Sequence, residues 1–145
     1  MENNFTKVHT SMDFIISGVI IAAGIGLFFI SMAAGIVVAL CGILLPICYK
    51  SGYKYGNKNI VLKHKQLEVS KKYQKNVLDF LNGDATDLEM QPGNESGTLL
   101  LEVWCNTQAS VAYAQLYDYM ELRFQPITEI IELPTEKVQK VIEKL

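Results

Sequence analysis

The longest apolar run of the chain spans residues 14–49, and these 36 positions contain no Asp, Glu, Lys, Arg or His. A single helix of that length would measure about 54 Å, whereas the hydrocarbon core of a bilayer is about 30 Å thick. Ordinary helix tilts do not absorb that difference. The pattern therefore excludes an ordinary soluble protein. It predicts a membrane protein with a two-helix transmembrane hairpin, with spans at about 14–30 and 33–49 and a turn near Ser31.

A cleaved signal peptide is the alternative explanation of residues 1–33, because the residues after the first apolar run loosely resemble a small-residue cleavage site. Two features disfavour it. Lys7 is the only basic residue before the apolar run apart from His9, and a 17-residue apolar core is longer than signal peptides normally carry. We therefore expect both spans in the mature chain.

Residues 60–145 follow a different pattern, in which runs of period two alternate with runs of helical period. Residues 60–69 predict a strand, with a backward extension of the following helix as the alternative. That helix presents one apolar face, formed by Tyr73, Val77, Phe80 and Leu81. Gly83 is a typical helix stop, and a polar loop over 84–97 comes next.

Two alternating runs, 98–105 and 110–120, predict an antiparallel hairpin with a four-residue connection. The register that sets Cys105 opposite Ser110 brings the apolar side chains of both strands to one face. The pairs on that face are Val103 with Ala112, Leu101 with Ala114, and Leu99 with Leu116. Small alanines there leave room for a helix to lie across the sheet.

A break at Gln125 and Pro126 separates this hairpin from a third predicted strand over 127–133. Thr135 then begins a last helix, whose apolar face is formed by Val138, Val141, Ile142 and Leu145. The resulting order is β-α-β-β-β-α. It predicts a small cytoplasmic α+β two-layer domain with both helices on one face of the sheet.

The charges of the chain are segregated, although they sum to a net charge of −2. Residues 50–75 contain eight lysines and one glutamate, whereas residues 76–134 contain ten acids and one arginine. Lys50, Lys54 and Lys58 follow the second span directly, in a basic juxtamembrane linker over 50–59. The positive-inside rule then places both termini, including the short segment 1–13, in the cytoplasm at the plasma (inner) membrane. The same lysines also suit anionic lipid headgroups.

Small residues recur at helical spacing in both predicted spans. Such residues let two backbones approach closely in lipid, where the hydrophobic effect does not drive helices together. Two interpretations remain open: packing of the hairpin on itself, or a seam between copies of the chain. The predicted helix-packing residues are Gly18, Ala22, Gly26, Gly35, Ala39 and Gly42.

No catalytic, metal-binding or cofactor-binding motif is recognisable in the sequence. The three cysteines lack the spacing of a zinc site, and there is no glycine-rich phosphate loop. The lysines crowd the membrane exit instead of covering a folded face with aromatics between them, so we do not expect nucleic-acid binding. The spans carry no ionisable group, which argues against a transporter and favours an anchor.

The outer face of the predicted hairpin carries Trp104, Tyr113 and Tyr117, and aromatic residues beside polar groups are typical of interface centres. The sequence therefore predicts a non-catalytic interaction module, anchored in the lipid bilayer, that binds a protein partner through these three residues. Stabilisation of the sheet by the same aromatics is the alternative for this face. For the whole chain the alternatives are an accessory or oligomeric subunit of a membrane complex, and an enzyme with an unrecognised site.

Overall fold

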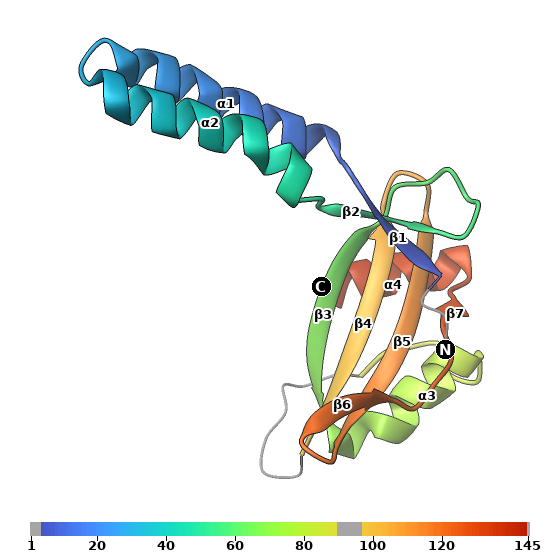
Figure 1. Cartoon of the computed structure of the whole chain (residues 1–145). Helices are drawn as coiled ribbons and strands as arrows, with labels where there is room; N and C mark the ends of the chain where they lie inside the picture. The colour runs from blue at the N-terminus through green and yellow to red at the C-terminus, as the bar shows by residue number, and fades with distance from the viewer. Residues whose placement is uncertain (1–3, 90–96, 145) are drawn as a thin grey trace. The chain divides into compact units, whose positions relative to one another are not determined.

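The computed structural model describes residues 4–89 and 97–144. The chain divides into two compact units, which we call the hairpin unit (Met1–Val61) and the sheet unit (Leu62–Leu145). The hairpin unit contains two helices and a pair of short strands, and the sheet unit is an α+β domain (Figure 1). The expected combination of an apolar helix pair with an α+β domain is thus present.

Helices α1 (Ser11–Phe28) and α2 (Met32–Cys48) lie side by side and are joined by a short turn (Figure 1). Their bounds differ from the predicted spans by three residues or fewer. Helix α1 begins earlier than predicted because Asp13 caps it: the carboxylate accepts a hydrogen bond of 3.0 Å from the backbone N–H of Thr10. By length and composition α1 is able to cross a membrane, whereas α2 is a shorter apolar helix.

Glycines line the seam between α1 and α2. A Cβ atom added at Gly24 would lie 2.6 Å from the backbone nitrogen of Ala39, and one added at Gly35 would lie 2.5 Å from the backbone of α1. A Cβ atom added at Gly42 would lie 2.7 Å from the Ile21 side chain of α1, and the Gly42 carbonyl accepts a hydrogen bond from Ser17 Oγ. The two backbones are therefore in direct contact, and a larger side chain at these positions would push them apart.

Large apolar side chains cover the outside of the helix pair. The exposed ones include Phe14, Ile15, Val19, Ile25, Ile36, Val37, Leu40, Ile43, Leu44 and Ile47. The pair thus has small residues inside and large apolar residues outside, which is the reverse of a helical hairpin that folds in water.

Two short strands flank the helix pair, in segments that the sequence analysis assigned to a terminus and a linker. Strand β1 (Phe5–Val8) pairs antiparallel with β2 (Gly52–Tyr55), so that Phe5 lies opposite Tyr55 and Val8 opposite Gly52. Each strand has four residues and the whole helix pair separates them in sequence. Local pattern therefore gave no signal for their pairing.

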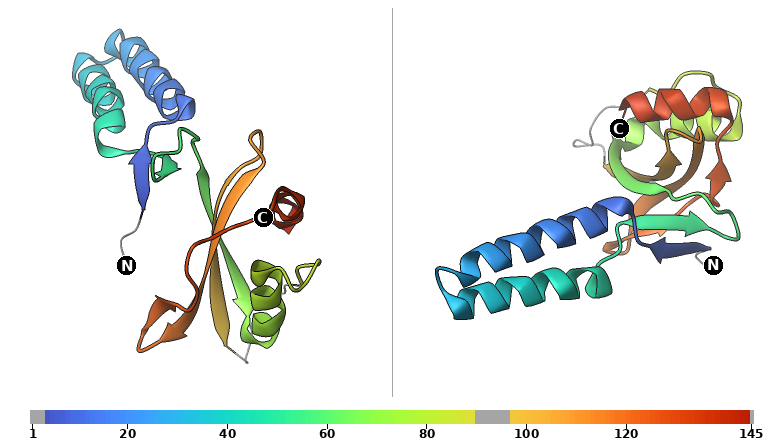
Figure 2. Two further views of the ribbon diagram at one scale, coloured as in Figure 1. Left: turned by 90° about the vertical axis from the view of Figure 1, so that its right-hand side faces the viewer. Right: turned by 90° about the horizontal axis from the view of Figure 1, so that it is seen from above.

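In the described residues of the sheet unit, five antiparallel strands form the sheet, and the helices lie on one of its faces (Figure 2). The strands are β3 (Lys63–Ser70), β4 (Thr98–Asn106), β5 (Val111–Met120), β6 (Arg123–Pro126) and β7 (Ile131–Glu132). The helical segments are η1 (Lys71–Tyr73), α3 (Gln74–Asn82) and α4 (Thr135–Lys144). Strands β3, β4, β5 and β6 are neighbours in that order, and β7 pairs with β5. The predicted α+β class is confirmed, with one more short strand than expected.

The core of the sheet unit lies between the helices and the inner face of the sheet. Helix α3 contributes Val77 and Phe80, helix α4 contributes Val138 and Val141, and the sheet contributes Leu99, Leu101, Val103, Ala112, Ala114 and Leu116. Gly83 ends α3 at a φ of +98°, as its position predicts. Leu145 and part of the polar loop, residues 90–96, lie outside the described residues.

The predicted register of β4 and β5 is wrong by two residues. Cys105 lies opposite Ala112 instead of Ser110, and the connection runs from Thr107 to Ser110. The Asn106 side chain accepts a hydrogen bond of 2.8 Å from Ala109 N, and Ser110 adopts a φ of +51°. A shift of two residues keeps every side chain on its predicted face, which is why the facing pattern alone did not reveal it.

The third predicted strand is also wrong in its position. Gln125 and Pro126 do not break the chain but belong to the edge strand β6, where proline is tolerated because it needs to donate no ladder hydrogen bond. Of the predicted span 127–133, β7 (Ile131–Glu132) is strand. Thr128 lies between them and its hydroxyl accepts a hydrogen bond from Leu116 N.

Two glycine substitutions in α1 test the close contact between the helices, because we expect one to destabilise the helix pair and the other to stabilise it. Gly24→Ala places a methyl group against the α2 backbone and should destabilise the helix pair by about 1–3 kcal/mol. At Gly26 an added Cβ meets nothing within 4 Å, so Gly26→Ala should stabilise the helix by about 0.5–1 kcal/mol. Thermal unfolding of the full chain in detergent measures both. Equal effects of the two substitutions would contradict the seam.

Candidate functional site

The three aromatic residues predicted to bind a partner share the outer face of the sheet, which is the face opposite α3 and α4. Trp104 on β4 lies directly opposite Tyr113 on β5, and Tyr117 lies four residues further along β5. Trp104 and Tyr113 are 4% and 2% exposed, and Tyr117 is half-buried. The structure brings the three residues together but leaves little of their area accessible, so their binding role stays a prediction.

His64 also lies on this outer face, although it was not among the predicted site residues. Its ring stacks on the ring of Trp104, with centroids 5.0 Å apart and planes inclined by 20°. The β3–β4 register places His64 directly opposite Trp104. The sequence signal existed, because alternation along residues 60–69 assigns His64 to the outer face. That assignment did not connect His64 with Trp104, because the pairing of β3 with β4 was not predicted.

Polar groups connect the outer face to its surroundings. Glu102 accepts a hydrogen bond of 2.8 Å from Gln66 Nε2, and its Oε1 lies 3.7 Å from His64 Nε2. The Tyr117 hydroxyl donates a hydrogen bond of 2.8 Å to Gln115 Oε1. Gln115 Nε2 in turn donates to the carbonyl oxygen of Thr128, in the segment between β6 and β7. These contacts link β3 to β4 and, separately, β5 to the segment between β6 and β7.

Two titratable groups of this face, Glu102 and Tyr117, have shifted pKa values. The neighbouring His64 side chain and the hydrogen bond from Gln66 hold the pKa of Glu102 below its ordinary value, against the opposing effect of burial. Burial, with the nearby Glu102 charge, raises the pKa of Tyr117 to about 12. Tyr117 therefore stays protonated at neutral pH, and Glu102 stays ionised. Glu102 and Tyr117 can therefore hold a fixed hydrogen-bond pattern on this face.

Cys105 lies on the core face, where burial raises the pKa of its thiol. A buried thiol with a raised pKa is unreactive. Within residues 4–89 and 97–144 there is no group of three or more His, Cys, Asp or Glu side chains that could hold a metal ion.

A second surface, the β5–β6 tip, carries exposed apolar side chains that sequence analysis did not single out. They are Tyr119, Met120, Leu122 and Phe124. The rings of Tyr119 and Phe124 pack edge to face with centroids 5.2 Å apart, and Leu122 is 89% exposed. The tip was missed because Gln125 and Pro126 were interpreted as a break after β5.

The backbone of the β5–β6 tip is strained. Glu121 and Leu122 adopt φ values of +53° and +65° in the two-residue turn between Met120 and Arg123. Asn and Gly are the usual residues of such turns, because left-handed conformations disfavour branched or bulky side chains. An exposed leucine at a strained position suggests a role outside folding.

The predicted helix-packing residues separate into two sets. Gly35, Ala39 and Gly42 lie in the seam between α1 and α2, with Gly24 and Ser17, which were not predicted. Gly18, Ala22 and Gly26 are exposed on the outside of the pair. The stripe on α1 is therefore not used by the hairpin itself.

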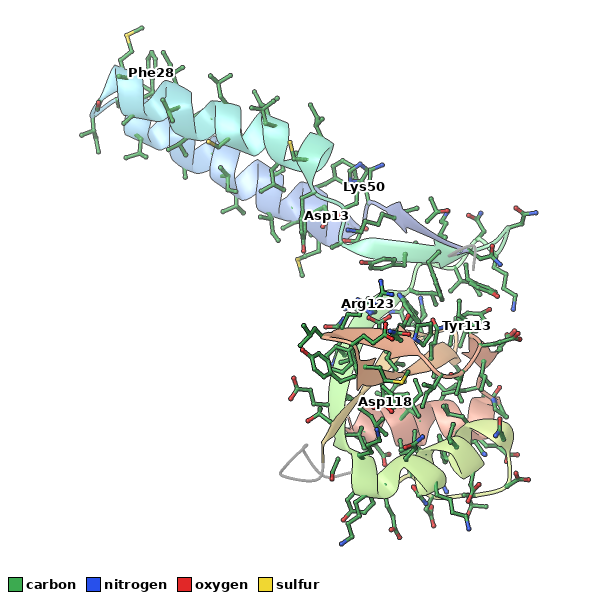
Figure 3. The ribbon with its side chains drawn as sticks, turned by 60° about the horizontal axis from the view of Figure 1, so that its bottom comes forward. Asp13, Phe28, Lys50, Tyr113, Asp118 and Arg123 are labelled. Carbon is green, nitrogen blue, oxygen red and sulfur yellow. The ribbon has the colours of Figure 1, made fainter. Side chains whose placement is uncertain are left out.

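The predicted headgroup lysines all belong to the hairpin unit. Lys50 follows α2, Lys54 lies in β2, and Lys58 lies in the turn after β2. Lys54 Nζ donates a hydrogen bond of 2.7 Å to Asn59 Oδ1. In Figure 3, Lys50 and Asp13 lie at one end of the helix pair and Phe28 at the other.

Glu102→Gln tests the polar cluster through its pH dependence. Because the pKa of Glu102 is lowered on folding, its contribution is present above the ordinary glutamate value of 4.5 and is lost as the pH falls below it. The substitution should lower the free energy of unfolding by about 1 kcal/mol at pH 7, since the group is partly exposed. In denaturant titrations the difference from the wild type should shrink as the pH falls below 4.5 and vanish once Glu102 is protonated in the folded state. A difference that persists there would rule out this role.

Comparisons of the chain with protein-family models, with curated proteins and with solved structures find no match. A function for this chain must therefore be argued from its own geometry.

Proposed function

We propose that the chain is a membrane-anchored, non-catalytic interaction module. In this proposal α1 and α2 cross the bilayer as a hairpin, and the sheet unit binds a protein partner in the cytoplasm. The observation that best supports the anchor is the packing of the helix pair, which has small residues inside and large apolar residues outside.

The surface of the helix pair suits lipid. In water, each large apolar side chain that stays exposed lacks the stabilising free energy of about 1.5–3 kcal/mol that its burial would give. The helix pair exposes many such side chains. In a bilayer those side chains face hydrocarbon, and close contact at small residues holds the helices together. The 17 residues of α2 span about 26 Å, which is at the short end of the range for a crossing.

The lysines after α2 support one orientation. Lys50, Lys54 and Lys58 follow the end of α2, whereas the turn at residues 29–31 carries no charge. The positive-inside rule places the lysine-bearing end in the cytoplasm, and a double crossing returns the N-terminus to the same side. We therefore propose a two-pass protein of the plasma (inner) membrane.

The β5–β6 tip is the best-supported partner surface. Tyr, Met, Phe and Arg are enriched at protein interfaces, and the tip presents all four types, with Arg123 at the turn. It is accessible, whereas Trp104 and Tyr113 are nearly covered. A rigid two-strand element holds the side chains in place, so little entropy would be lost on binding.

The charges of the tip favour a protein over a lipid surface. Glu121 lies beside Arg123, so the tip has no excess positive charge to attract an anionic leaflet. Apolar groups rimmed by both signs of charge are typical of protein–protein contacts. A protein partner with an apolar pocket is therefore the proposed occupant.

Leu122→Gly tests the tip, because it separates binding from folding. Glycine accepts the left-handed backbone, and relief of about 1–2 kcal/mol of strain outweighs the roughly 0.5–1 kcal/mol of entropy that glycine adds to the unfolded chain, so the sheet unit should not be destabilised while the side chain is lost. Ser110→Gly is the matched control, since Ser110 is also in the left-handed region, in the β4–β5 connection. Partners crosslinked to the full chain in native membranes should be lost from Leu122→Gly and retained by Ser110→Gly.

Two results would speak against this surface. Undiminished crosslinking of the same partner to Leu122→Gly would show that the partner binds elsewhere. Destabilisation by Leu122→Gly would show that Leu122 serves the fold.

A second candidate function is an oligomeric or accessory subunit of a membrane complex. It is favoured by the position of Gly18 and Gly26, where an added Cβ would meet nothing within 4 Å. With Ala22, these residues form a stripe of small side chains that faces away from α2. Such a stripe permits close approach of a helix from another chain.

Ala22→Leu distinguishes this function from that of a simple tether. A bulky side chain in the stripe should reduce the assembly mass measured by light scattering in mild detergent. Ala23→Leu, also exposed on α1, is the control and should leave the mass unchanged. A mass that Ala22→Leu does not alter would exclude a seam at this stripe.

A further inference from the structure

Strands β1 and β2, which we call the ribbon, form one structured end of the hairpin unit. Cross-strand neighbours place Phe5, Lys7, Tyr53 and Tyr55 on the same face. The rings of Phe5 and Tyr55 have centroids 4.9 Å apart, and Lys7 Nζ lies 6.0 Å from the centroid of Tyr53. The segments before and after the helix pair thus combine aromatic rings with a cation.

The ribbon is fixed to the end of the helix pair by Asp13. The Asp13 carboxylate accepts hydrogen bonds from the backbone N–H groups of Thr10 and Ser51, at 3.0 and 3.1 Å. The hydroxyls of Thr10 and Ser51 are 2.7 Å apart. These contacts connect the start of α1 to the segment between α2 and β2, so the ribbon cannot move far from the helix ends.

The charge of this end is positive toward its surroundings. Lys7, Lys50 and Lys58 are exposed and Lys54 is half-buried. Within residues 4–61 the one acidic residue is Asp13, which is 1% exposed and faces inward. Among the described residues of the hairpin unit, four lysines therefore lie at this end, and the one carboxylate, that of Asp13, faces inward.

The length of α1 sets the depth of the ribbon if the pair crosses a membrane. Eighteen residues span about 27 Å, close to the hydrocarbon thickness of about 30 Å. The ribbon follows directly after the helix ends and would lie at the level of the headgroups. Aromatic rings and lysines are the residues that settle at that level, where lysines meet lipid phosphates.

We propose that the ribbon is a binding surface for anionic phospholipid headgroups. Lys7, Lys50, Lys54 and Lys58 donate to phosphodiester oxygens, and Phe5, Tyr53 and Tyr55 sit among the glycerol and upper acyl groups. This inference rests on the proposed membrane crossing and adds a lipid preference to it. The anchor thereby discriminates between lipids in addition to holding the chain.

Lipid retention by the full chain tests the proposal. The chain is reconstituted in vesicles with equal amounts of phosphatidylcholine and phosphatidylglycerol, extracted in mild detergent, and its retained lipids are quantified by mass spectrometry. We expect phosphatidylglycerol to be enriched about three- to tenfold, because the lysines attract the anionic lipid and salt partly screens that attraction. Replacing Lys7, Lys50, Lys54 and Lys58 together by Gln should return the ratio to that of the vesicle.

A matched control separates the ribbon from net charge. Replacing four exposed lysines of the sheet unit by Gln changes the total charge equally and should leave the enrichment intact; these are Lys63, Lys65, Lys72 and Lys75. Equal loss in both variants, or an unenriched wild type, would overturn the lipid site. Alkaline carbonate extraction distinguishes failure of the membrane crossing from failure of the lipid site alone. A wild type released by carbonate would overturn the membrane crossing and the lipid site together, whereas a retained but unenriched wild type would overturn the lipid site alone.

Discussion

The close contact between the backbones of α1 and α2 is the interaction on which the rest of the hairpin unit depends. Glycines at 24, 35 and 42 bring the helices too close for any larger side chain between them. Valine, isoleucine, leucine and phenylalanine are consequently left on the outside of the pair. A surface of that kind is costly in water and favourable in hydrocarbon, so one packing choice links the small residues of the sequence to a membrane environment.

The same contact explains how two distant segments become neighbours. Because the helices are antiparallel and of similar length, the start of α1 and the end of α2 meet, and Asp13 fastens them through Thr10 and Ser51. Strands β1 and β2 then pair, although each alone is too short to be stable. The lysines and aromatic rings that gather there owe their proximity to the seam. The partner surface that we propose lies in the sheet unit and depends instead on the strained turn at Glu121 and Leu122.

Several features were predictable because they arise from local pattern. The uncharged run located both helices, Gly83 marked the end of α3, and alternation assigned Leu99, Leu101 and Val103 to the core.

Features that depend on distant pairing were not predictable. The spacing of Gly18, Ala22 and Gly26 marks a face of α1 that points away from α2, whereas Gly24 and Ser17, seven residues apart, line the seam. The β4–β5 register slipped by two residues because such a shift leaves the facing pattern unchanged. His64 acquired a place on the outer face only through its pairing with Trp104.

A double crossing of the bilayer is most directly tested by the location of the two chain ends. Reporters that are active in only one compartment can be fused to either terminus of the full chain in cells. Two crossings predict that both termini report the cytoplasm. Reporters in opposite compartments would show a single crossing, and the contact between α1 and α2 would then not exist in the membrane.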